Sequence, residues 1–514
     1  MLSRVYSSGV IGIEGFEVVV ECSSWNRIPK FELVGLPDAA VKEAKNRVMS
    51  ACENSGVKFP SMDIMVNLAP ADMKKEGTAL DLAILCAVLQ SDGVIPFDYD
   101  FSDKCLLGEL SLSGELRPIK GVLPMAIKAK ECGRRKIFLP MRNAGEAAVV
   151  DGIEVFGLNS LREFLDHVKG KTTLAPTVAP DFNAGRAERG DLPDFSDVRG
   201  QLKAKRALEV AAAGGHNVLM IGPPGTGKSM LAKRIPSILP DMTLNEAIEI
   251  TKIHSVTGLL KENLVSSRPF RSPHHTVSPV GFVGGGTNPQ PGEISLSHNG
   301  VLFLDELPEF PKSVTEAMRQ PLEDGVVTVT RASAKVTFPA EFMLICAMNP
   351  CKCGFFGDPT KECTCSPASR KQYLDRISGP LLDRIDIEIE LPAVSYDDIS
   401  GKSAPGERSS VIRERVNAAR RFSLERLKDA GQTRVILNSA LSGSLFRRFC
   451  TPDREGEELM REAFESLGLS ARGHDRVLRV ARTIADLDGA ETINADHIAE
   501  AVMYRSLDRK YWRK

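Results

Sequence analysis

The stretch Asn217-Val-Leu-Met-Ile-Gly-Pro-Pro-Gly-Thr-Gly-Lys-Ser-Met230 decides how the rest of the chain is interpreted. Val218 to Ile221 is a short apolar run that predicts a buried strand, and a helix is expected from Met230 to Ile235. Residues 222–229 fit the Walker A pattern G-x-x-x-x-G-K-[ST]. A glycine-rich turn between a strand and a helix presents backbone N–H groups to phosphate oxygens. The stretch therefore predicts a nucleoside triphosphate site.

The residues of this site have distinct expected roles. The glycines let the backbone curl, Lys228 places a positive charge on the outer phosphates, and Ser229 offers its hydroxyl to Mg²⁺. A second apolar strand ends in Asp305-Glu306, which fits a Walker B motif. Asp305 is expected to hold Mg²⁺ with Ser229, and Glu306 to act as the base that polarises the attacking water. The expected nucleotide-binding residues are Gly222, Pro223, Pro224, Gly225, Thr226, Gly227, Lys228 and Ser229.

Length and composition limit the classes of protein to which the chain can belong. With 514 residues, the chain is expected to contain about three domains. Its 42% apolar and 26% charged residues are typical of a soluble globular protein. The chain has no run of 18 apolar residues and no signal-peptide core, so we expect a cytoplasmic location and no membrane contact. The formal net charge of −1 neither favours nor excludes nucleic acid, because a basic pore can lie inside a neutral chain.

Further residues resemble catalytic elements of AAA+ ATPases. Asn349 ends an apolar strand and resembles sensor 1. Arg384 stands where that family places its arginine finger, with Arg376 as a second candidate and a surface salt bridge as the alternative for both. Arg472, in Leu-Ser-Ala-Arg-Gly-His, resembles sensor 2, with Arg476 as the alternative. The family's arginine finger reaches the ATP of a neighbouring subunit, so the resemblance implies a ring, expected to be a hexamer.

Two turn-rich inserts interrupt the ATPase pattern. Ser278 to Leu296 and Gly325 to Phe338 are each expected to form a hairpin. They resemble the inserts of magnesium chelatase ATPases and minichromosome-maintenance helicases, whose hairpins face the pore. Arg331 and Lys335, at the tip of the second, are expected to contact DNA phosphates. The alternative for each residue is an ordinary exposed turn.

The N-terminal part resembles the proteolytic domain of Lon-type proteases, which use a Ser–Lys dyad. Ala79 occupies the position of the serine, and Leu123 the position of the lysine. Thr78 and Lys120 lie nearby but off register. Without an activated nucleophile we expect a Lon-like fold with no protease activity. The basic residues that either contact DNA or form a solvated face are Lys42, Lys45, Arg47, Lys74 and Lys75.

Four cysteines follow the strand that ends in Asn349, with the spacing C-x-C-x₉-C-x-C. Four thiolates from a loop rich in turns can close a tetrahedral Zn²⁺ site. A redox pair or unliganded thiols are the alternatives. The histidines at 274–275 lack a third ligand at useful spacing and are not expected to bind metal. The candidate zinc ligands are Cys351, Cys353, Cys363 and Cys365.

The chain as a whole resembles the ComM/YifB family, which consists of magnesium-chelatase-like AAA+ proteins with a Lon-like N-terminal domain. Residues 268–275, 291–296 and 302–310 are the most specific stretches. The resemblance implies a hexameric DNA helicase that uses ATP and Mg²⁺. Such an enzyme promotes branch migration on single-stranded or branched DNA in natural transformation and homologous recombination. A chelatase-type motor subunit that remodels a protein partner is the alternative function.

The expected fold class is α/β, with an AAA+ P-loop core and a helical lid. We expect a Lon-protease-like α/β domain at 1–170 and a linker at 171–192. The AAA+ core is expected at 193–392, with the cysteine loop at 351–365 inside it, and the lid at 393–514.

Overall fold

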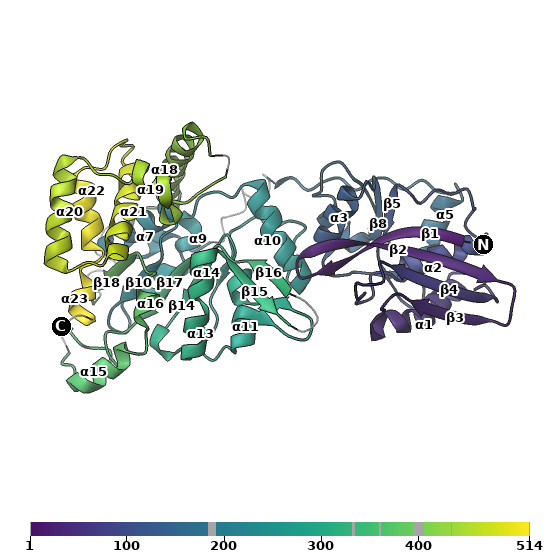
Figure 1. Cartoon of the computed structure of the whole chain (residues 1–514), viewed down its shortest axis with the longest axis horizontal. Helices are drawn as coiled ribbons and strands as arrows, with labels where there is room; N and C mark the ends of the chain where they lie inside the picture. Colours follow the sequence, from purple (N-terminus) through teal and green to yellow (C-terminus); the bar gives the residue numbers. More distant parts are fainter. Residues whose placement is uncertain are drawn as a thin grey trace. The chain divides into compact units, whose positions relative to one another are not determined.

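The chain folds into two compact units (Figure 1). Unit 1 contains residues 1–184 and 244–266, and unit 2 contains residues 185–243 and 267–514. Both units mix helices and sheets, which confirms the α/β fold class. No helix in the described part of the chain is both long and apolar enough to cross a membrane. The computed structural model describes residues 2–182, 192–331, 335–358, 361–393, 406–432 and 434–512.

Unit 1 contains a four-stranded sheet in the order β1-β2-β4-β3. Its pairs are antiparallel except that β3 runs parallel to β4. The apolar pattern from Val10 to Cys22 predicts one strand, but the chain turns at Gly12, whose φ of +63° suits a glycine. A hairpin therefore replaces the expected single strand. The strands are β1 (Leu2–Ile11), β2 (Glu14–Trp25), β3 (Lys30–Val34) and β4 (Asp63–Ala69).

Helix α2 (Asp81–Ser91) packs on β1 and β2 and is buried along its whole length. Its first residue, Asp81, accepts hydrogen bonds from Arg47 Nε at 2.8 Å and Nη2 at 2.9 Å. Burial raises the pKa of Asp81, although Arg47 acts in the opposite direction. Arg47 is paired with Asp81 and Lys75 is buried, so neither side chain fits either alternative, a DNA contact or a solvated face. Helix α1 (Ala39–Asn54) packs beside α2.

A second sheet of unit 1 is parallel and has the order β5-β8-β9. Helices α4 and α5 follow β8 and β9 directly, whereas the short strands β6 and β7 separate β5 from α3. The strands are β5 (Lys104–Leu106), β8 (Lys136–Pro140) and β9 (Glu154–Leu158), and a small hairpin is formed by β6 (Glu109–Leu110) and β7 (Leu116–Arg117). The helices are α3 (Val122–Glu131), α4 (Met141–Ala147) and α5 (Leu161–Val168).

Helix α10 (Leu244–Thr257) belongs to unit 1, although it follows the Walker A helix in the sequence. It packs on α3. The Ser255 hydroxyl donates to the buried carboxylate of Glu146, which also accepts from the Leu123 N–H at 2.8 Å. The predicted AAA+ core at 193–392 therefore includes a segment, residues 244–266, that packs with unit 1 instead.

Unit 2 is built on a five-stranded parallel sheet in the order β11-β14-β17-β10-β18. Strands β10, β14 and β17 are buried along their whole length, as expected for parallel strands covered on both faces. Strand β17 lies between β10 and β14, so the ends of all three strands meet at one edge. The strands are β10 (Val218–Ile221), β11 (Phe270–Arg271), β14 (Val301–Leu304), β17 (Met343–Met348) and β18 (Ile387–Glu390).

Helices flank this sheet, and further helices gather beyond it at the C-terminal end of the chain (yellow-green in Figure 1). The helices of unit 2 that precede the C-terminal group, apart from those of the first insert, are α7 (Leu202–Gly214), α8 (Lys228–Ala232), α9 (Ile235–Ile238), α13 (Lys312–Ala317), α14 (Arg319–Asp324), α15 (Pro367–Leu374) and α16 (Gly379–Leu382), with the 3-10 helices η2 (Phe195–Asp197) and η3 (Leu307–Glu309). The C-terminal elements are α18 (Ser409–Asp429), η4 (Asn438–Ala440), α19 (Gly443–Phe449), α20 (Arg454–Leu467), α21 (Ala471–Leu487), α22 (Ala495–Met503) and α23 (Leu507–Tyr511).

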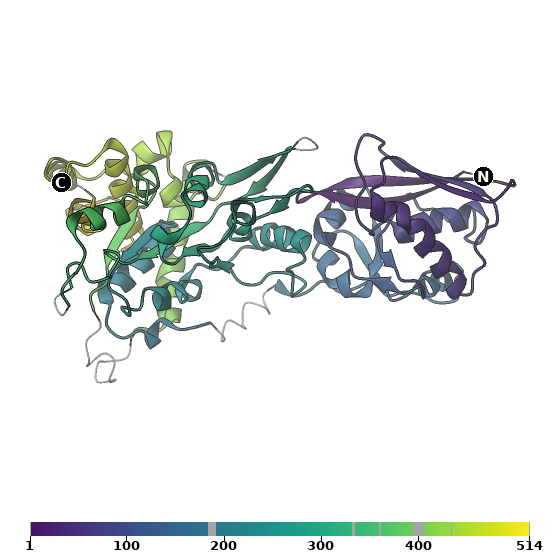
Figure 2. The ribbon, with the colours of Figure 1, turned by 90° about the horizontal axis from the view of Figure 1, so that it is seen from below.

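Both predicted inserts contain antiparallel strand pairs. The second insert is a hairpin of β15 (Val326–Thr330) and β16 (Lys335–Pro339), which runs out as a narrow ribbon in Figure 2. The first insert has only a two-residue strand pair, flanked by short helices. Its elements are α11 (Pro279–Val283), β12 (Gly284–Gly285), β13 (Gln290–Pro291) and α12 (Glu293–Leu296).

Candidate functional site

The Walker A loop connects β10 to α8, as the sequence predicts. Gly225 and Gly227 have φ values of +80° and +86°, a conformation that other residues rarely adopt. Gly222 is needed for space, because a β-carbon on it would lie 2.6 Å from the Leu391 carbonyl oxygen. The three glycines therefore let the loop curl tightly beneath the N-terminus of α8, where a phosphate would be bound.

Lys228 lies in the fold of this loop. Its Nζ donates to the Gly222 carbonyl at 2.7 Å, to the Pro223 carbonyl at 2.9 Å and to Asn349 Oδ1 at 3.2 Å. Burial lowers the pKa of Lys228 to about 8, although the nearby Asp305 and Glu306 raise it. The ammonium group thus sits where the phosphate loop meets the residue predicted to be sensor 1.

Ser229 and Asp305, the two residues expected to hold Mg²⁺, contact each other. The Ser229 hydroxyl donates to Asp305 Oδ2 at 2.6 Å. Mg²⁺ prefers oxygen ligands, and a P-loop hydroxyl beside a strand-end carboxylate supplies them. The two residues fit the metal, which would neutralise phosphate charge when bound.

Glu306 has an unusual backbone conformation, with φ +54° and ψ +47° in the left-handed region. Such conformations are uncommon for residues other than glycine and concentrate at functional sites. Its side chain is 59% exposed, and Oε2 lies 3.7 Å from Nδ1 of His275. Sequence reasoning considered His275 only as a metal ligand and missed this neighbour, because the contact joins residues about 30 positions apart.

The two arginine-finger candidates both have partners within this chain. Arg384 has a side chain that is 10% exposed, pairs with Glu323 and donates from Nη1 to the Pro380 carbonyl at 2.7 Å. Arg376 is half-exposed and donates from Nη1 to Glu309 Oε2 at 2.9 Å. The action of either arginine on a neighbouring subunit stays a prediction.

The two sensor 2 candidates have different environments. Arg472 lies in the first turn of α21, is 67% exposed and approaches Asp383 Oδ2 at 4.0 Å. Arg476 is buried, and its Nε lies 3.6 Å from Oδ1 of Asp386, while Oδ2 of the same carboxylate lies 3.3 Å from His216 Nδ1. Burial lowers the pKa of Arg476 to about 10. These contacts make Arg476 part of the packed interior, whereas Arg472 is accessible to a ligand.

The predicted DNA-contacting residues, Arg331 and Lys335, are both exposed. Arg331 Nε lies 3.4 Å from the Gly286 carbonyl oxygen, so the second insert contacts the first. A β-carbon added to the neighbouring Gly285 would lie 3.0 Å from Arg331 Nη2, so a side chain there would press on the end of the arginine.

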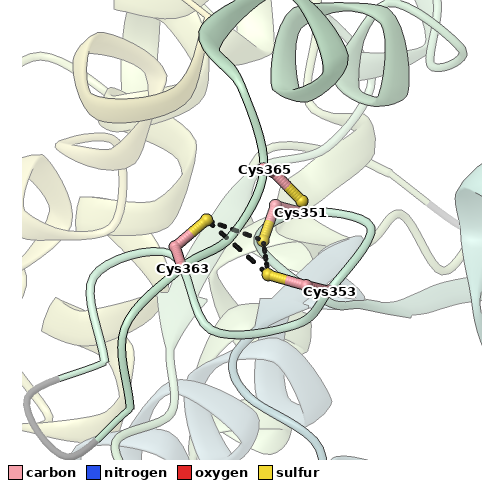
Figure 3. A group of neighbouring side chains, drawn as sticks. All are labelled: Cys351, Cys353, Cys363 and Cys365. Carbon is pink, nitrogen blue, oxygen red and sulfur yellow. Dashed lines mark hydrogen bonds between the residues drawn. The ribbon is translucent and has the colours of Figure 1, made fainter.

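The four cysteines of the loop converge (Figure 3). Their sulfur atoms all lie within 4.8 Å of one another. Cys351 Sγ is 3.3 Å from Cys353 Sγ and 3.7 Å from Cys363 Sγ. Although desolvation acts to raise it, backbone N–H groups and the neighbouring thiols lower the pKa of Cys353 to about 5. A set of four convergent thiols, one of them readily deprotonated, fits a tetrahedral metal site.

This cysteine loop contacts the phosphate loop. A β-carbon on Gly354 would lie 2.7 Å from Cδ of Pro224. On its other side, the ring of Phe356 packs against Tyr511, whose hydroxyl donates to Glu390 Oε1 at 2.8 Å. The loop is thus held between the nucleotide site and the C-terminal helix α23.

The positions of the Lon dyad lie in an apolar core. Ala79 and Leu123 are both buried and belong to the same cluster of buried side chains in unit 1. The absence of protease activity stays a prediction.

Comparisons with known proteins agree with this geometry. Family models described as magnesium chelatase subunit ChlI match residues 194–399, 20–143 and, for its C-terminal part, 406–505. The chain is 42% identical to the competence protein ComM of Haemophilus influenzae and 41% identical to the uncharacterized protein YifB of Escherichia coli. Each match covers 99% of this chain and 98% of the relative.

A shorter match links the chain to proteases. Lon protease 2 of Bacillus subtilis is 28% identical over 130 residues, which is 25% of this chain and 22% of the protease. The chain therefore belongs to the ComM/YifB family of magnesium-chelatase-like AAA+ ATPases with a Lon-like N-terminal part.

Proposed function

We propose that this chain is an ATP-driven DNA helicase that works as a hexameric ring and promotes branch migration. The family implies an ATPase, and the relative named competence protein ComM suggests DNA taken up in natural transformation and exchanged by homologous recombination. The observation that carries the proposal is the contact between the two inserts, which places the exposed Arg331 beside the first insert. Exposed cations grouped on protruding hairpins are suited to a phosphate backbone.

The ATPase site supplies the chemistry for this work. Lys228 and the loop glycines bind and orient the phosphates, and Ser229 and Asp305 would hold Mg²⁺. Glu306 is placed to polarise the attacking water, and Asn349 to contact the outer phosphate. Arg384 or Arg376 would complete the site of the next subunit in the ring, and Arg472 would contact the nucleotide from the lid. Hydrolysis in one subunit would then depend on its neighbour.

The test is ATP turnover with and without single-stranded and branched DNA, followed by strand displacement on a branched substrate. Arg331→Ala and Lys335→Ala are expected to weaken DNA binding uniformly across sequences and to reduce its salt dependence. Arg454→Ala, which removes an arginine that is 92% exposed in the C-terminal region, is the control and should leave DNA binding unchanged. Absence of both DNA-stimulated turnover and strand displacement would contradict the helicase function.

A chelatase-type motor that remodels a protein partner is the second candidate. It is favoured by the description of the matching family models, magnesium chelatase subunit ChlI. An ATPase that ignores DNA but is stimulated by a co-purifying protein would support this function instead.

We infer in addition that the four-cysteine cluster holds Zn²⁺. The convergence of four sulfur atoms within 4.8 Å supports this ligand. We expect the purified chain to contain one zinc per subunit by elemental analysis, and Cys363→Ser to lose it. Cys132→Ser, which removes a half-exposed thiol of unit 1, is the matched control. A metal-free wild-type chain that melts at the same temperature with and without added zinc would contradict the inference.

A further inference from the structure

Strand β3 forms one edge of the four-stranded sheet of unit 1. It stands last in the order β1-β2-β4-β3, and within the described part of the chain it pairs with β4 alone (Figure 1). The edge of a sheet presents backbone N–H and C=O groups to which another strand can bind. Large apolar side chains lie at both ends of this edge, with Ile28 88% exposed, Val34 41% exposed and Leu36 54% exposed. The edge of β3 therefore has the properties of a docking strand.

The direction of the backbone groups along β3 follows from its pairing with β4. The Lys30 N–H donates to the Met62 carbonyl at 3.3 Å, so the backbone groups of Lys30 point toward β4. Backbone groups alternate in direction along a strand, which turns those of Glu32 toward β4 as well. The N–H and C=O groups of Phe31 and Leu33 therefore point outward, to the edge of the sheet.

The side chains of β3 divide between two faces in the same alternating way. Phe31 and Leu33 pack against the buried cluster of unit 1, and the ring of Phe31 lies 6.2 Å from that of Phe59. Lys30 and Glu32 occupy the other face, where 62% and 41% of their side chains are exposed. Lys30 Nζ lies 2.6 Å from Glu32 Oε1. The solvent face of the strand thus carries one positive and one negative charge, two residues apart.

This pattern is complementary to itself. In an antiparallel pair of β3 strands centred on Phe31, Lys30 of each chain lies opposite Glu32 of the other. The two Phe31 residues exchange both of their backbone hydrogen bonds, and each Leu33 N–H reaches the Pro29 carbonyl of the other chain. Opposite charges that face each other across a strand pair stabilise it. Every charge in this pair has an opposite charge beside it, both along its own strand and across the pair.

Adjacent registers lack this match. An antiparallel pair centred on Glu32 or on Lys30 places two like charges directly opposite each other, which is destabilising. The register centred on Phe31 also directs Val34 of each chain toward the turn that carries Ile28 of the other. Ile28 lines a shallow pocket at that turn. The apolar ends of the edge and its charged middle therefore favour the same alignment.

Proline and lysine on an edge strand can also prevent pairing. Here Pro29 lies at the end of the pair, where its missing N–H removes a single hydrogen bond from each end. Lys30 would repel an approaching strand only if no carboxylate met it, and Glu32 of the second chain does. A merely protected edge would not need a carboxylate at this spacing.

We propose that β3 is a self-association surface, which pairs antiparallel with β3 of a second copy of this chain about a two-fold axis at Phe31. Each chain offers β3 once, so this contact closes after two chains. The proposal goes beyond the proposed function and involves neither ATP nor DNA. An arginine finger joins unlike faces of neighbouring subunits, whereas this contact joins two identical edges.

The first test is disulfide cross-linking of the full chain. Residues opposite each other without backbone hydrogen bonds have α-carbons about 4.5 Å apart, which suits a disulfide. Lys30→Cys combined with Glu32→Cys should therefore give a covalent dimer when oxidised by dissolved oxygen. Within one chain the two positions lie about 6.6 Å apart with parallel side chains, which disfavours an internal disulfide. Each single variant should give no more dimer than wild type, because its thiol faces a charged side chain.

Absence of a covalent dimer from the double variant overturns the proposal. A dimer of Glu32→Cys alone overturns the register, since it places two Glu32 residues opposite each other. A mixed disulfide with a co-purifying protein, with none between two copies, overturns the choice of partner.

The second test reverses the charges and measures the concentration at which chains pair, by sedimentation without nucleotide. Glu32→Lys leaves four lysines facing one another and should raise this concentration at least about tenfold. Adding Lys30→Glu restores the alternation with the signs exchanged and should return the concentration to within about threefold of wild type. A double variant that pairs no better than Glu32→Lys overturns the proposed alignment.

A matched control is Glu76→Lys. Glu76 also has a lysine two residues away, with Lys74 Nζ 2.7 Å from its Oε1, but it lies outside β3. This variant should pair at the same concentration as wild type, and a shift equal to that of Glu32→Lys would overturn the assignment to β3. Any ring formed through the ATPase units is common to all these proteins, so the differences among them report on β3 whether or not the helicase function holds.

Discussion

Gly354 of the cysteine loop is packed directly against Pro224 of the phosphate loop, so closely that a β-carbon on Gly354 would lie 2.7 Å from the proline Cδ. Gly354 also has a φ of +90°, which other residues adopt only at a cost. The candidate metal cluster is therefore mechanically joined to the nucleotide site, although the sequence separates them by more than a hundred residues.

We expect Gly354→Ala to weaken ATP binding, because the added methyl group displaces Pro224. Gly357→Ala is the control within the same loop: its φ is +80°, but its β-carbon would meet only the end of Lys510, at 3.7 Å. Both variants should lose about 1–2 kcal/mol of stability from backbone strain. Only Gly354→Ala should raise the Kd for a fluorescent ATP analogue, and equal Kd values would show that the contact does not affect the nucleotide site.

We expect ATP affinity to fall as the pH rises through about 8, where burial places the pKa of Lys228. The pKa is depressed from 10.5, so between about 8 and 10.5 the folded chain without nucleotide binds fewer protons than the unfolded chain. The free energy of unfolding of the nucleotide-free chain should therefore rise with pH across this window. Binding of the phosphates should favour the charged form of Lys228, so the lysine should take up a proton when ATP binds. Calorimetry above pH 8 in buffers of different ionisation enthalpy should detect proton uptake on binding. Lys228→Ala should bind ATP weakly at every pH. In the proposed ring, this variant should also abolish the ATP-driven activity of the whole assembly.

We expect Glu306→Gln to bind ATP but to hydrolyse it at least about 100-fold more slowly, since general base catalysis contributes rate factors of this size. Glu341→Gln is the control, because this glutamate is exposed and paired with Arg434. Phosphate release measured at saturating ATP distinguishes the two variants. Normal turnover by Glu306→Gln would overturn the assignment of the base.

We expect the two sensor 2 candidates to separate in their effects. Arg476→Ala should lower the free energy of unfolding by about 3 kcal/mol, because it leaves the buried Asp386 without one of its partners. Although burial acts to raise it, contacts with His216 and Arg476 hold the pKa of Asp386 below its ordinary value. Arg472→Ala should leave stability unchanged and reduce ATP turnover. Chemical denaturation and turnover assays together decide the matter, and the reverse pattern would exchange the two assignments.

Local sequence patterns predicted the short buried strands that carry the candidate ATPase residues. The Walker A loop, Asp305 and Asn349 each follow a short buried strand, and a parallel sheet brings such strand ends together. Asn349 contacts Lys228 because β17 pairs with β10. The residue pattern alone does not predict this strand pairing, but the family resemblance implies it.

The contacts that sequence reasoning missed depend on tertiary neighbours. Arg384 pairs with Glu323 and His275 approaches Glu306, and neither pair has a spacing that a helix or hairpin would impose. The sequence of α10 does not specify which unit covers the buried face of this helix. The turn at Gly12 was missed for a different reason, since isolated glycines within a strand-like run are a weak turn signal.

The membership of α10 in unit 1 means that this protein is not modular in the way its sequence order suggests. The chain enters unit 1 twice, so no single cut divides the two units. A chain shortened to begin at residue 193 would keep α10 but lose α3, and the side chain of Ile248 would lose the buried cluster of unit 1 against which it packs. An exchange of unit 1 between relatives must transfer two separate stretches of the gene together. Because the chain returns to unit 1 after the Walker A loop, the Lon-like part and the ATPase cannot be separated at a single position.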